Sequence, residues 1–214
     1  MSDARSHINQ AIRAIDQQKQ LLEDITELSG DDCLLLLAEL GRRHSEVRAL
    51  VNKAAIEAGA PSGARERILR YLLLTQGKVV DKDEISGVAG IFEWARRIRE
   101  LRVEEGWPIS SSENRPELQP GQYVLEATAP DPELKERWQQ ANAIRRLPET
   151  PTARILKFLE AYRGSAVTGE ELDYVAKTSD WESRLRVLRE EGHPIKWESE
   201  GGLSPGAVML ADSD

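Results

Sequence analysis

The chain has 214 residues, of which 40% are hydrophobic and 31% are charged, and its formal net charge at neutral pH is -8. This length allows one or two domains, and the composition is typical of a helix-rich globular protein. The acidic balance argues against a protein that coats nucleic acid nonspecifically, because such binding depends on neutralising phosphates. It leaves room for a local basic face on an acidic body.

Other features of the composition exclude further classes. The longest apolar run, from Cys33 to Ala38, is far shorter than the roughly 18–20 residues that cross a bilayer. No apolar segment follows the first residues, so we expect no signal peptide. A single cysteine excludes an internal disulfide and indicates a reducing cytoplasm, or the nucleoid for a DNA-bound protein. Three histidines and one cysteine offer few zinc ligands, so we expect no metal and no cofactor.

Two helical stretches come first in the chain and predict an antiparallel hairpin over residues 1–58. The first, residues 3–28, carries an apolar stripe of Ile8, Ile12, Ile15, Leu22 and Ile25. Residues 29–32 read as the turn. The second helix, residues 33–58, carries an apolar stripe of Leu36, Leu40, Val47, Val51 and Ala54. Leu34, Leu35 and Leu37 widen that face, so we expect the hairpin to form a homodimer or to bind a protein partner. Cys33 is expected to be a buried structural thiol.

An internal repeat organises the rest of the chain. The segment 67–72 recurs 87 residues later as 154–159, and the matches continue in order with two one-residue slips. The paired positions include Gly77 and Gly164, Trp94 and Trp181, Leu101-Arg102 and Leu188-Arg189, and Trp107-Pro108-Ile109 and His193-Pro194-Ile195. The sequence therefore predicts two copies of one structural unit, at residues 64–126 and 152–211, joined by a connecting helix at residues 131–147.

Each unit has the element order of a winged helix-turn-helix domain. A first helix ends near Gly77 or Gly164, and a short strand leads to a second helix that begins with a capping box, Asp81-x-x-Glu84 or Thr168-x-x-Glu171. A third helix and a β-hairpin follow. The predicted fold is mainly α with small β-hairpins (α+β). It has tandem winged helix-turn-helix domains preceded by an N-terminal helical hairpin.

The third helices carry the most informative polar residues, because in helix-turn-helix domains this helix enters the major groove. Arginine there can bond guanine or phosphate. We identify as candidate DNA-binding residues Arg96, Arg97, Arg99 and Arg102 in the first unit and Arg184, Arg186 and Arg189 in the second, with Arg115 in the first wing. Salt bridges to nearby glutamates, as on any solvated helix face, would explain the same arginines without DNA. The second unit is the more acidic, and its loop 198–200 would repel phosphate.

Catalytic motifs are absent from the sequence. It contains no G-x-S-x-G elbow, no phosphate-binding loop and no G-x-G-x-x-G, and its three histidines lie in separate regions. We therefore expect that the protein is not an enzyme. Trp94 and Trp181 lie in the apolar stripes of the third helices and are expected in the core. Trp138 is expected to dock the connecting helix onto a unit.

Three segments resemble the N-terminal winged-helix region of bacterial HNH-type restriction endonucleases. They are WARRIRELR at 94–102, EEGWPI at 104–109 and LQPGQYVLE at 118–126, with a weaker match over 152–210. The resemblance implies a DNA-reading role for Arg96, Arg97, Arg99 and Arg102. Where that family continues into a zinc-ribbon nuclease, this chain has a helix and a second winged helix, so cleavage does not carry over.

Two functions follow from these observations. The first is a sequence- or modification-specific binder of double-stranded DNA, a recognition protein or regulator in a restriction or phage-defence setting. The second is an interaction scaffold or adaptor in a larger complex, without direct DNA contact. Binding that weakens steeply with salt would indicate the first, because it reports displaced phosphate counterions.

Overall fold

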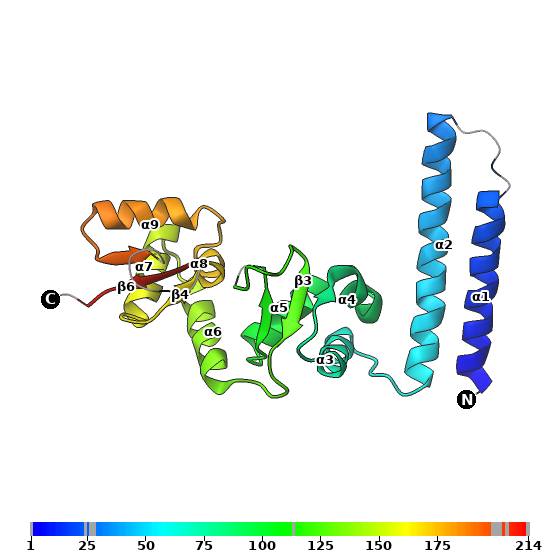
Figure 1. Ribbon diagram of the computed structural model, residues 1–214, viewed down its shortest axis with the longest axis horizontal. Helices are drawn as coiled ribbons and strands as arrows, with labels where there is room; N and C mark the ends of the chain where they lie inside the picture. Colours follow the sequence, from blue (N-terminus) through cyan, green and yellow to red (C-terminus); the bar gives the residue numbers. More distant parts are fainter. Residues whose placement is uncertain are drawn as a thin grey trace. The chain divides into compact units, whose positions relative to one another are not determined.

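The computed structural model describes residues 2–23, 25, 29–112, 114–197, 203 and 206–212. Over these residues the protein is mainly helical, with an N-terminal helical hairpin and two small antiparallel sheets (Figure 1). The predicted fold class is confirmed. The chain divides into two compact units, one made of residues 1–70 and 83–94 and the other of residues 71–82 and 95–214.

The hairpin consists of α1 (Ser2–Glu23) and α2 (Gly30–Glu57). Its α1 face differs from the predicted one: Ala11, Ala14 and Gln18 are buried, whereas the larger Ile12, Ile15 and Leu22 are 47%, 50% and 49% exposed. The stripe predicted for α1 is therefore wrong at Ile12, Ile15 and Leu22, whereas Ile8 is half-buried. Small alanine side chains let the two helix backbones approach closely, and the isoleucines one position along remain outside the contact. Two further expectations need correction: Val51 is 44% exposed and Cys33 is half-buried.

The segment predicted as a turn begins α2. Ser29 is the N-cap, and its hydroxyl accepts a hydrogen bond from the backbone N–H of Asp32 at 3.2 Å. The Asp32 carboxylate accepts in return from the Ser29 N–H at 3.1 Å. This capping box satisfies N–H groups that the first turn leaves unpaired, so the helix starts three residues earlier than expected. The hydrogen bonds from Ser29 also hold the pKa of Asp32 below its usual range.

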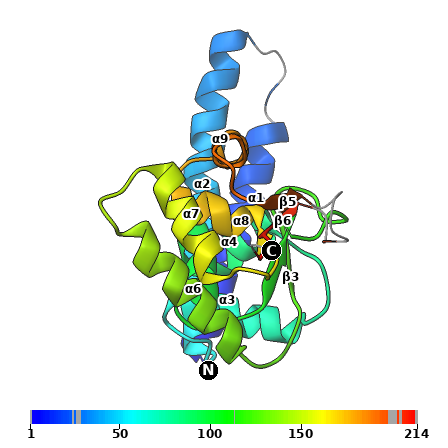
Figure 2. The same ribbon diagram turned by 90° about the vertical axis from the view of Figure 1, so that its left-hand side faces the viewer.

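The two repeats contain the same six elements in the same order (Figure 1 and Figure 2). The first repeat has α3 (Ala64–Leu74), β1 (Val80–Asp81), α4 (Lys82–Ala89), α5 (Trp94–Val103), β2 (Ile109–Ser111) and β3 (Gln122–Leu125). The second has α7 (Pro151–Ala161), β4 (Val167–Thr168), α8 (Gly169–Ala176), α9 (Trp181–Glu190), β5 (Ile195–Trp197) and β6 (Ala207–Leu210). The sheets have equivalent strand orders, β1-β3-β2 and β4-β6-β5.

Matched backbone contacts fix the ends of the first helices. Gly77 and Gly164 both have φ of 75°, a left-handed conformation that glycine adopts without strain. The N–H of Gly77 donates to the Leu125 carbonyl at 3.0 Å, and that of Gly164 to the Leu210 carbonyl at 2.9 Å. Each glycine therefore turns the chain from the first helix and ties it to the last strand of its sheet.

The connecting helix α6 (Pro132–Arg145) precedes the second repeat. Its start agrees with the predicted range 131–147, since Asp131 is the N-cap and Pro132 lies in the first turn. Trp138 is 4% exposed and belongs to the buried cluster of the second repeat, together with Phe158 and Leu185, so it docks α6 as expected. Helices α6, α7 and α8 consequently lie side by side (Figure 1 and Figure 2).

Candidate nucleic-acid interface

Helix α5 places its four arginines in different environments, because its apolar stripe fixes which side faces the core. Arg96 lies outside, with 65% of its side chain exposed, and Arg99 is exposed as well. Arg97 is half-buried, with 32% of its side chain exposed, and Arg102 is buried at 9%. Fewer arginines therefore lie on the exposed face of α5 than the sequence predicted.

Two of these arginines share one carboxylate. Arg96 Nε donates to Glu100 at 3.0 Å, and Arg97 Nη1 donates to the same carboxylate at 2.6 Å. Burial raises the pKa of Glu100, but the hydrogen bonds from Arg97 and Arg96 outweigh it, so that the pKa lies below its usual range. The carboxylate is thus charged at neutral pH and holds both guanidinium groups along the helix, as the salt-bridged alternative for this face predicts.

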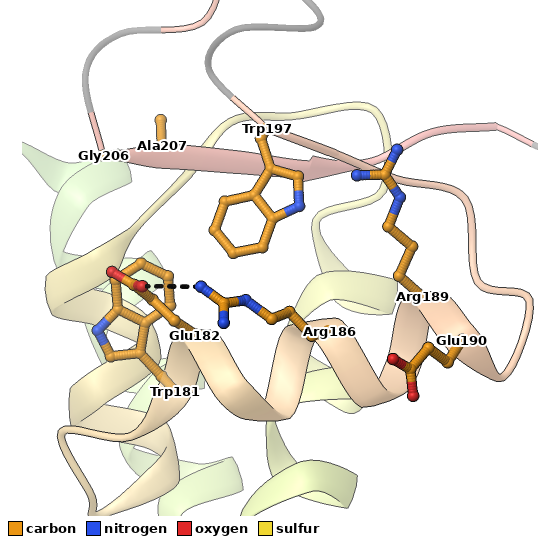
Figure 3. A pocket seen from close by; sticks show the side chains of 8 residues that line it. All are labelled: Trp181, Glu182, Arg186, Arg189, Glu190, Trp197, Gly206 and Ala207. Atoms are coloured by element: carbon orange, nitrogen blue, oxygen red, sulfur yellow. Dashed lines mark ion pairs between the residues drawn. The ribbon is translucent and has the colours of Figure 1, made fainter.

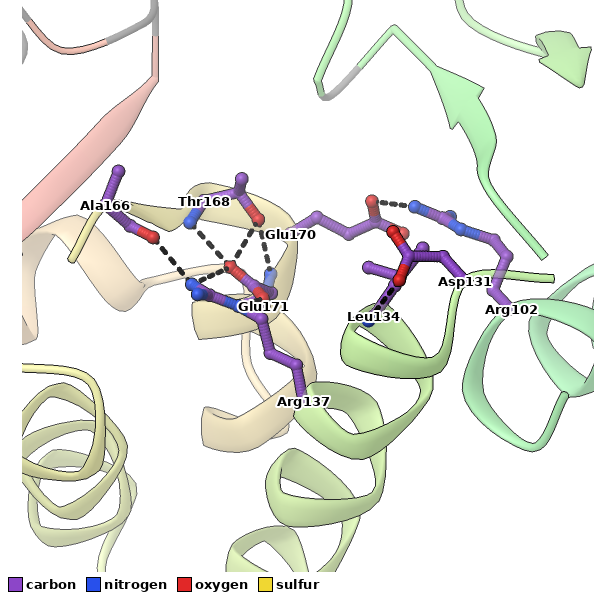
Figure 4. A network of polar contacts seen from close by, with 8 residues as sticks. All are labelled: Arg102, Asp131, Leu134, Arg137, Ala166, Thr168, Glu170 and Glu171. Carbon is purple, nitrogen blue, oxygen red and sulfur yellow. Dashed lines mark hydrogen bonds and ion pairs between the residues drawn. The ribbon is translucent and has the colours of Figure 1, made fainter. Parts of the chain in front are cut away.

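Arg102 lies in a contact with the second repeat. Its Nη2 atom donates to the carboxylate of Glu170 on α8 (Figure 4), and its Cζ atom is 5.6 Å from the centroid of the Trp138 ring. The side chains of Arg102 and Glu170 are only 11% and 16% exposed. The expectation that Arg102 belongs to the exposed polar face of the third helix is therefore wrong, because its partner comes from a distant part of the chain.

In the second repeat, α9 presents its arginines more openly. Arg184 is half-buried, and its Nη2 atom lies 3.6 Å from a carboxylate oxygen of Asp180. Arg186 has 71% of its side chain exposed and lies 3.9 Å from Glu182, which is a loose ion pair. Arg189 is exposed. Ion pairs of this kind contribute little to stability. The guanidinium groups of Arg184 and Arg186 can therefore exchange their carboxylates for a stronger anion at small cost.

The first wing contains Arg115, which is held by two carboxylates. Its Nε atom donates to Glu117 at 2.7 Å and its Nη1 atom to Glu126 at 3.0 Å. These hydrogen bonds raise the pKa of Arg115 above its ordinary value. The side chain therefore bridges the wing loop to the end of β3. The acidic loop 198–200 of the second wing lies outside the described residues.

A second polar network connects α6 to the start of α8. Arg137 on α6 donates to Glu171 and, at 2.6 Å, to the carbonyl of Ala166 (Figure 4). Glu171 also completes the predicted capping box, accepting from the N–H of Thr168 at 2.8 Å while its own N–H donates to the Thr168 hydroxyl at 3.3 Å. One carboxylate thus caps α8 and anchors α6, next to the Arg102–Glu170 contact.

One matched pair of arginines, Arg67 and Arg154, has a structural role that the sequence did not predict. Arg154 is 7% exposed, and its Nε and Nη2 atoms donate to the carbonyls of Val175 and Ala176 at 2.9 and 2.6 Å. Arg67 donates in the same way to the last two residues of α4. Each guanidinium satisfies carbonyls that the end of the second helix leaves unpaired. The available signal was an arginine repeated at the same place inside an apolar run.

No group of three or more His, Cys, Asp or Glu side chains within the described ranges is placed to hold a metal ion. None of the helices described here combines the length and the apolar character that a bilayer span requires.

The family of the chain is decided by a match that occurs twice. The family model described as KpnI N-terminal domain matches residues 65–126 and again residues 152–211, together more than half of the chain. The chain belongs to the KpnI N-terminal domain family. KpnI itself is an HNH-type restriction endonuclease. Each winged-helix repeat is thus one KpnI N-terminal domain, whereas the α1–α2 hairpin and α6 lie outside the matched segments. Comparisons with curated proteins and with solved structures give no match.

Proposed function

We propose that this protein binds duplex DNA through the exposed arginines of α5 and α9. The observation that carries the proposal is the double match to a domain named from a restriction endonuclease, each match containing a winged helix. In winged-helix proteins the third helix of the domain contacts the major groove. Its exposed guanidinium groups here belong to Arg96, Arg99, Arg186 and Arg189.

The contacts expected at these helices differ in kind. Arg99 is exposed, so its guanidinium can neutralise a phosphate and also reach a base edge, where a bidentate bond to guanine would contribute about 1–3 kcal/mol of discrimination. Arg96 shares Glu100 with Arg97 and is better suited to a phosphate, which needs no fixed fork. Arg102 and Arg115 are held by carboxylates and act as positioning residues in this proposal.

We further propose that the protein recognises its target without cleaving it, as a partner or regulator in a restriction or phage-defence setting. The support is that no residues of this sequence match the catalytic motif of HNH nucleases. The test is incubation with plasmid DNA and magnesium or manganese. Nicking by purified protein that copurifies with no nuclease would refute this part.

The DNA-binding proposal is tested by the salt dependence of binding to a random duplex library and to any motif enriched from it. The affinity falls with salt, and each lost phosphate contact makes the slope of log affinity against log salt less steep by about 0.9. The double variant Arg96→Ala with Arg99→Ala should therefore make it less steep by up to about 1.8. The matched control is Lys19→Ala with Lys53→Ala, which removes the same charge from the hairpin. Equal slopes for the two double variants would refute the proposal.

A second candidate function, the interaction scaffold, is favoured by the exposed aliphatic side chains of the hairpin. Leu34, Leu35 and Leu37 are 66%, 72% and 64% exposed on α2. Val51 and Ile56, towards the other end of this helix, are 44% and 41% exposed. A second α2 packed antiparallel would bring these side chains against the leucines and cover both, so we infer a homodimer through this surface.

Light scattering checks the dimer. Changing Leu34, Leu35 and Leu37 to serine should lower the mass that light scattering records, because the hairpin contact is lost, whereas serine at the exposed Leu74 should leave the mass unchanged. A wild-type monomer mass at every concentration would refute the homodimer and leave this surface for a different protein.

A further inference from the structure

The two repeats contain the same groove, between the third helix and the β-hairpin. Arg102 of α5 corresponds to Arg189 of α9, and both line a cavity in this position. The third residue of the first hairpin strand also lines both cavities. It is Ser111 in the first repeat, paired with Tyr123, and Trp197 in the second, paired with Val208. The equivalence allows the contents of one groove to be compared with those of the other.

In the first repeat, the groove is occupied by side chains from α6 and α8. Glu170 forms an ion pair with Arg102, and the Trp138 ring lies 5.6 Å from the Arg102 guanidinium carbon. A cavity of about 310 Å³ remains beside them. This groove therefore holds one aromatic ring and one carboxylate. The ring contacts the buried guanidinium through its face, and the carboxylate neutralises the guanidinium charge.

In the second repeat, no described side chain from outside α9 and the β-hairpin lines the equivalent groove, which has a cavity of about 750 Å³. Trp197 replaces the small serine, and its ring stacks with that of Trp181 at 6.4 Å between centroids and 28° between planes. Figure 3 shows Arg186 running beneath Trp197 towards Glu182, with Arg189 rising beside the ring. The described lining residues come from α9 and from the ends of β5 and β6.

The chain carries side chains with the required chemistry outside this groove. Phe92, between α4 and α5, is 88% exposed, the highest value among the large exposed hydrophobic side chains described. Glu93 follows it and is exposed. The residue equivalent to Phe92 in the second repeat is Ser179, so the fold does not need an aromatic ring at this position. Phe92 and Glu93 thus offer the ring and the carboxylate that Trp138 and Glu170 supply to the first groove.

We propose that the groove formed by Trp181, Trp197, Arg186 and Arg189 binds the Phe92–Glu93 corner of a second copy of this chain. The Phe92 ring packs against the tryptophans, and the Glu93 carboxylate pairs with Arg189, as Glu170 pairs with Arg102. Arg186 and Arg189 are also the exposed arginines of α9, so a bound corner and duplex DNA exclude each other from this helix. Because the corner and the groove are different surfaces, the contact is heterologous and adds copies head to tail. The inference does not depend on DNA binding.

The test uses two full-length variants that can meet in one direction only. Trp197→Ser gives the groove the serine found at the equivalent position of the first repeat and should abolish binding by the groove. Phe92→Ser gives the corner the serine found at the equivalent position of the second repeat and should abolish binding by the corner. Fluorescence anisotropy of labelled Trp197→Ser should report saturable binding to Phe92→Ser. It should be about 10- to 100-fold weaker with the variant that carries both changes, since one buried phenylalanine ring is lost. The hairpin is common to all three proteins, so its contact cancels in this comparison.

Further variants keep the proposal falsifiable even where Trp197→Ser fails to fold. Arg189→Glu should weaken binding to the Phe92–Glu93 corner, and Glu93→Arg on the partner copy should restore it. Val187→Ser, on α9 but outside the groove lining, should leave binding unchanged. Equal affinities of labelled Trp197→Ser for Phe92→Ser and for the double variant, or no rescue by Glu93→Arg, would overturn the proposal. So would competition for the groove by an oligonucleotide with an unpaired base that depends on Trp197 alone.

Discussion

Replacing Arg102 distinguishes the structural arginine of α5 from the arginines that we propose to contact DNA. Arg102→Met removes one partner of an ion pair whose side chains are 11% and 16% exposed, and leaves the Glu170 carboxylate without its guanidinium. Arg99→Met, one helical turn earlier, removes a guanidinium from the exposed face. We expect the first change to lower the free energy of unfolding and the second to weaken DNA binding.

The magnitudes follow from burial. Breaking a buried ion pair lowers the free energy of unfolding by about 3–5 kcal/mol. Because the Arg102–Glu170 pair is still partly exposed, we expect a loss near 3 kcal/mol. Replacing both residues by methionine should recover most of it, because two apolar side chains leave no uncompensated charge. Arg99→Met should change the free energy of unfolding by less than about 0.5 kcal/mol. It should lower the salt slope of DNA binding by about 0.9, whereas Arg102→Met should leave the slope unchanged.

Urea denaturation followed by tryptophan fluorescence gives the stability, and anisotropy of a labelled duplex at several salt concentrations gives the slope. The reasoning is refuted by the opposite pattern, in which Arg102→Met keeps wild-type stability and reduces the slope. That result would place Arg102 on the DNA and make its contact with Glu170 dispensable.

Two other predictions concern the remaining charged contacts. Arg154→Ala should lower the free energy of unfolding by about 3 kcal/mol, because buried carbonyls lose a charged donor. Glu160→Ala, on the exposed side of α7, should change the free energy of unfolding little. Urea denaturation checks both predictions. Hydrogen bonds from Arg42 and Arg43 lower the pKa of Glu39 from 4.5 to about 2, so the stabilisation of α2 by this cluster is present above pH 4.5 and is lost as pH falls towards 2. Carboxyl chemical shifts in an NMR titration report the midpoint, and a value near 4.5 would contradict the cluster.

The repeat made much of the fold predictable, because matched residues had to form matched elements. The caps at Asp131 and Thr168 could also be read directly, since they depend on residues two or three positions away. The buried face of α1 could not. Ile12 and Ala11 are adjacent in sequence, and helical periodicity does not tell which of two neighbouring stripes meets α2. The larger side chains suggested the wrong one, since close helix approach here favours alanine.

The candidate site was predictable only where it depends on a single helix. The exposure of Arg96 and Arg99 follows from the position of the apolar stripe on α5. The burial of Arg102 does not, because Trp138 reaches it from the connecting helix and Glu170 from the second repeat. Arg154 was hidden for a different reason: its role is to bond backbone carbonyls, and these leave no trace in side-chain patterns.

The contact between Arg102 and Glu170 has a consequence for target choice. It joins α5, the third helix of the first repeat, to α8 of the second repeat. The orientation of α5 relative to α9, the third helix of the second repeat, is thereby restrained. If both third helices bind DNA as proposed, the fixed distance between them selects the target. The second helix adds affinity only where the two half-sites on the duplex have the matching separation, and a single inserted base pair would remove that gain. A pair of domains on a flexible linker would tolerate the insertion.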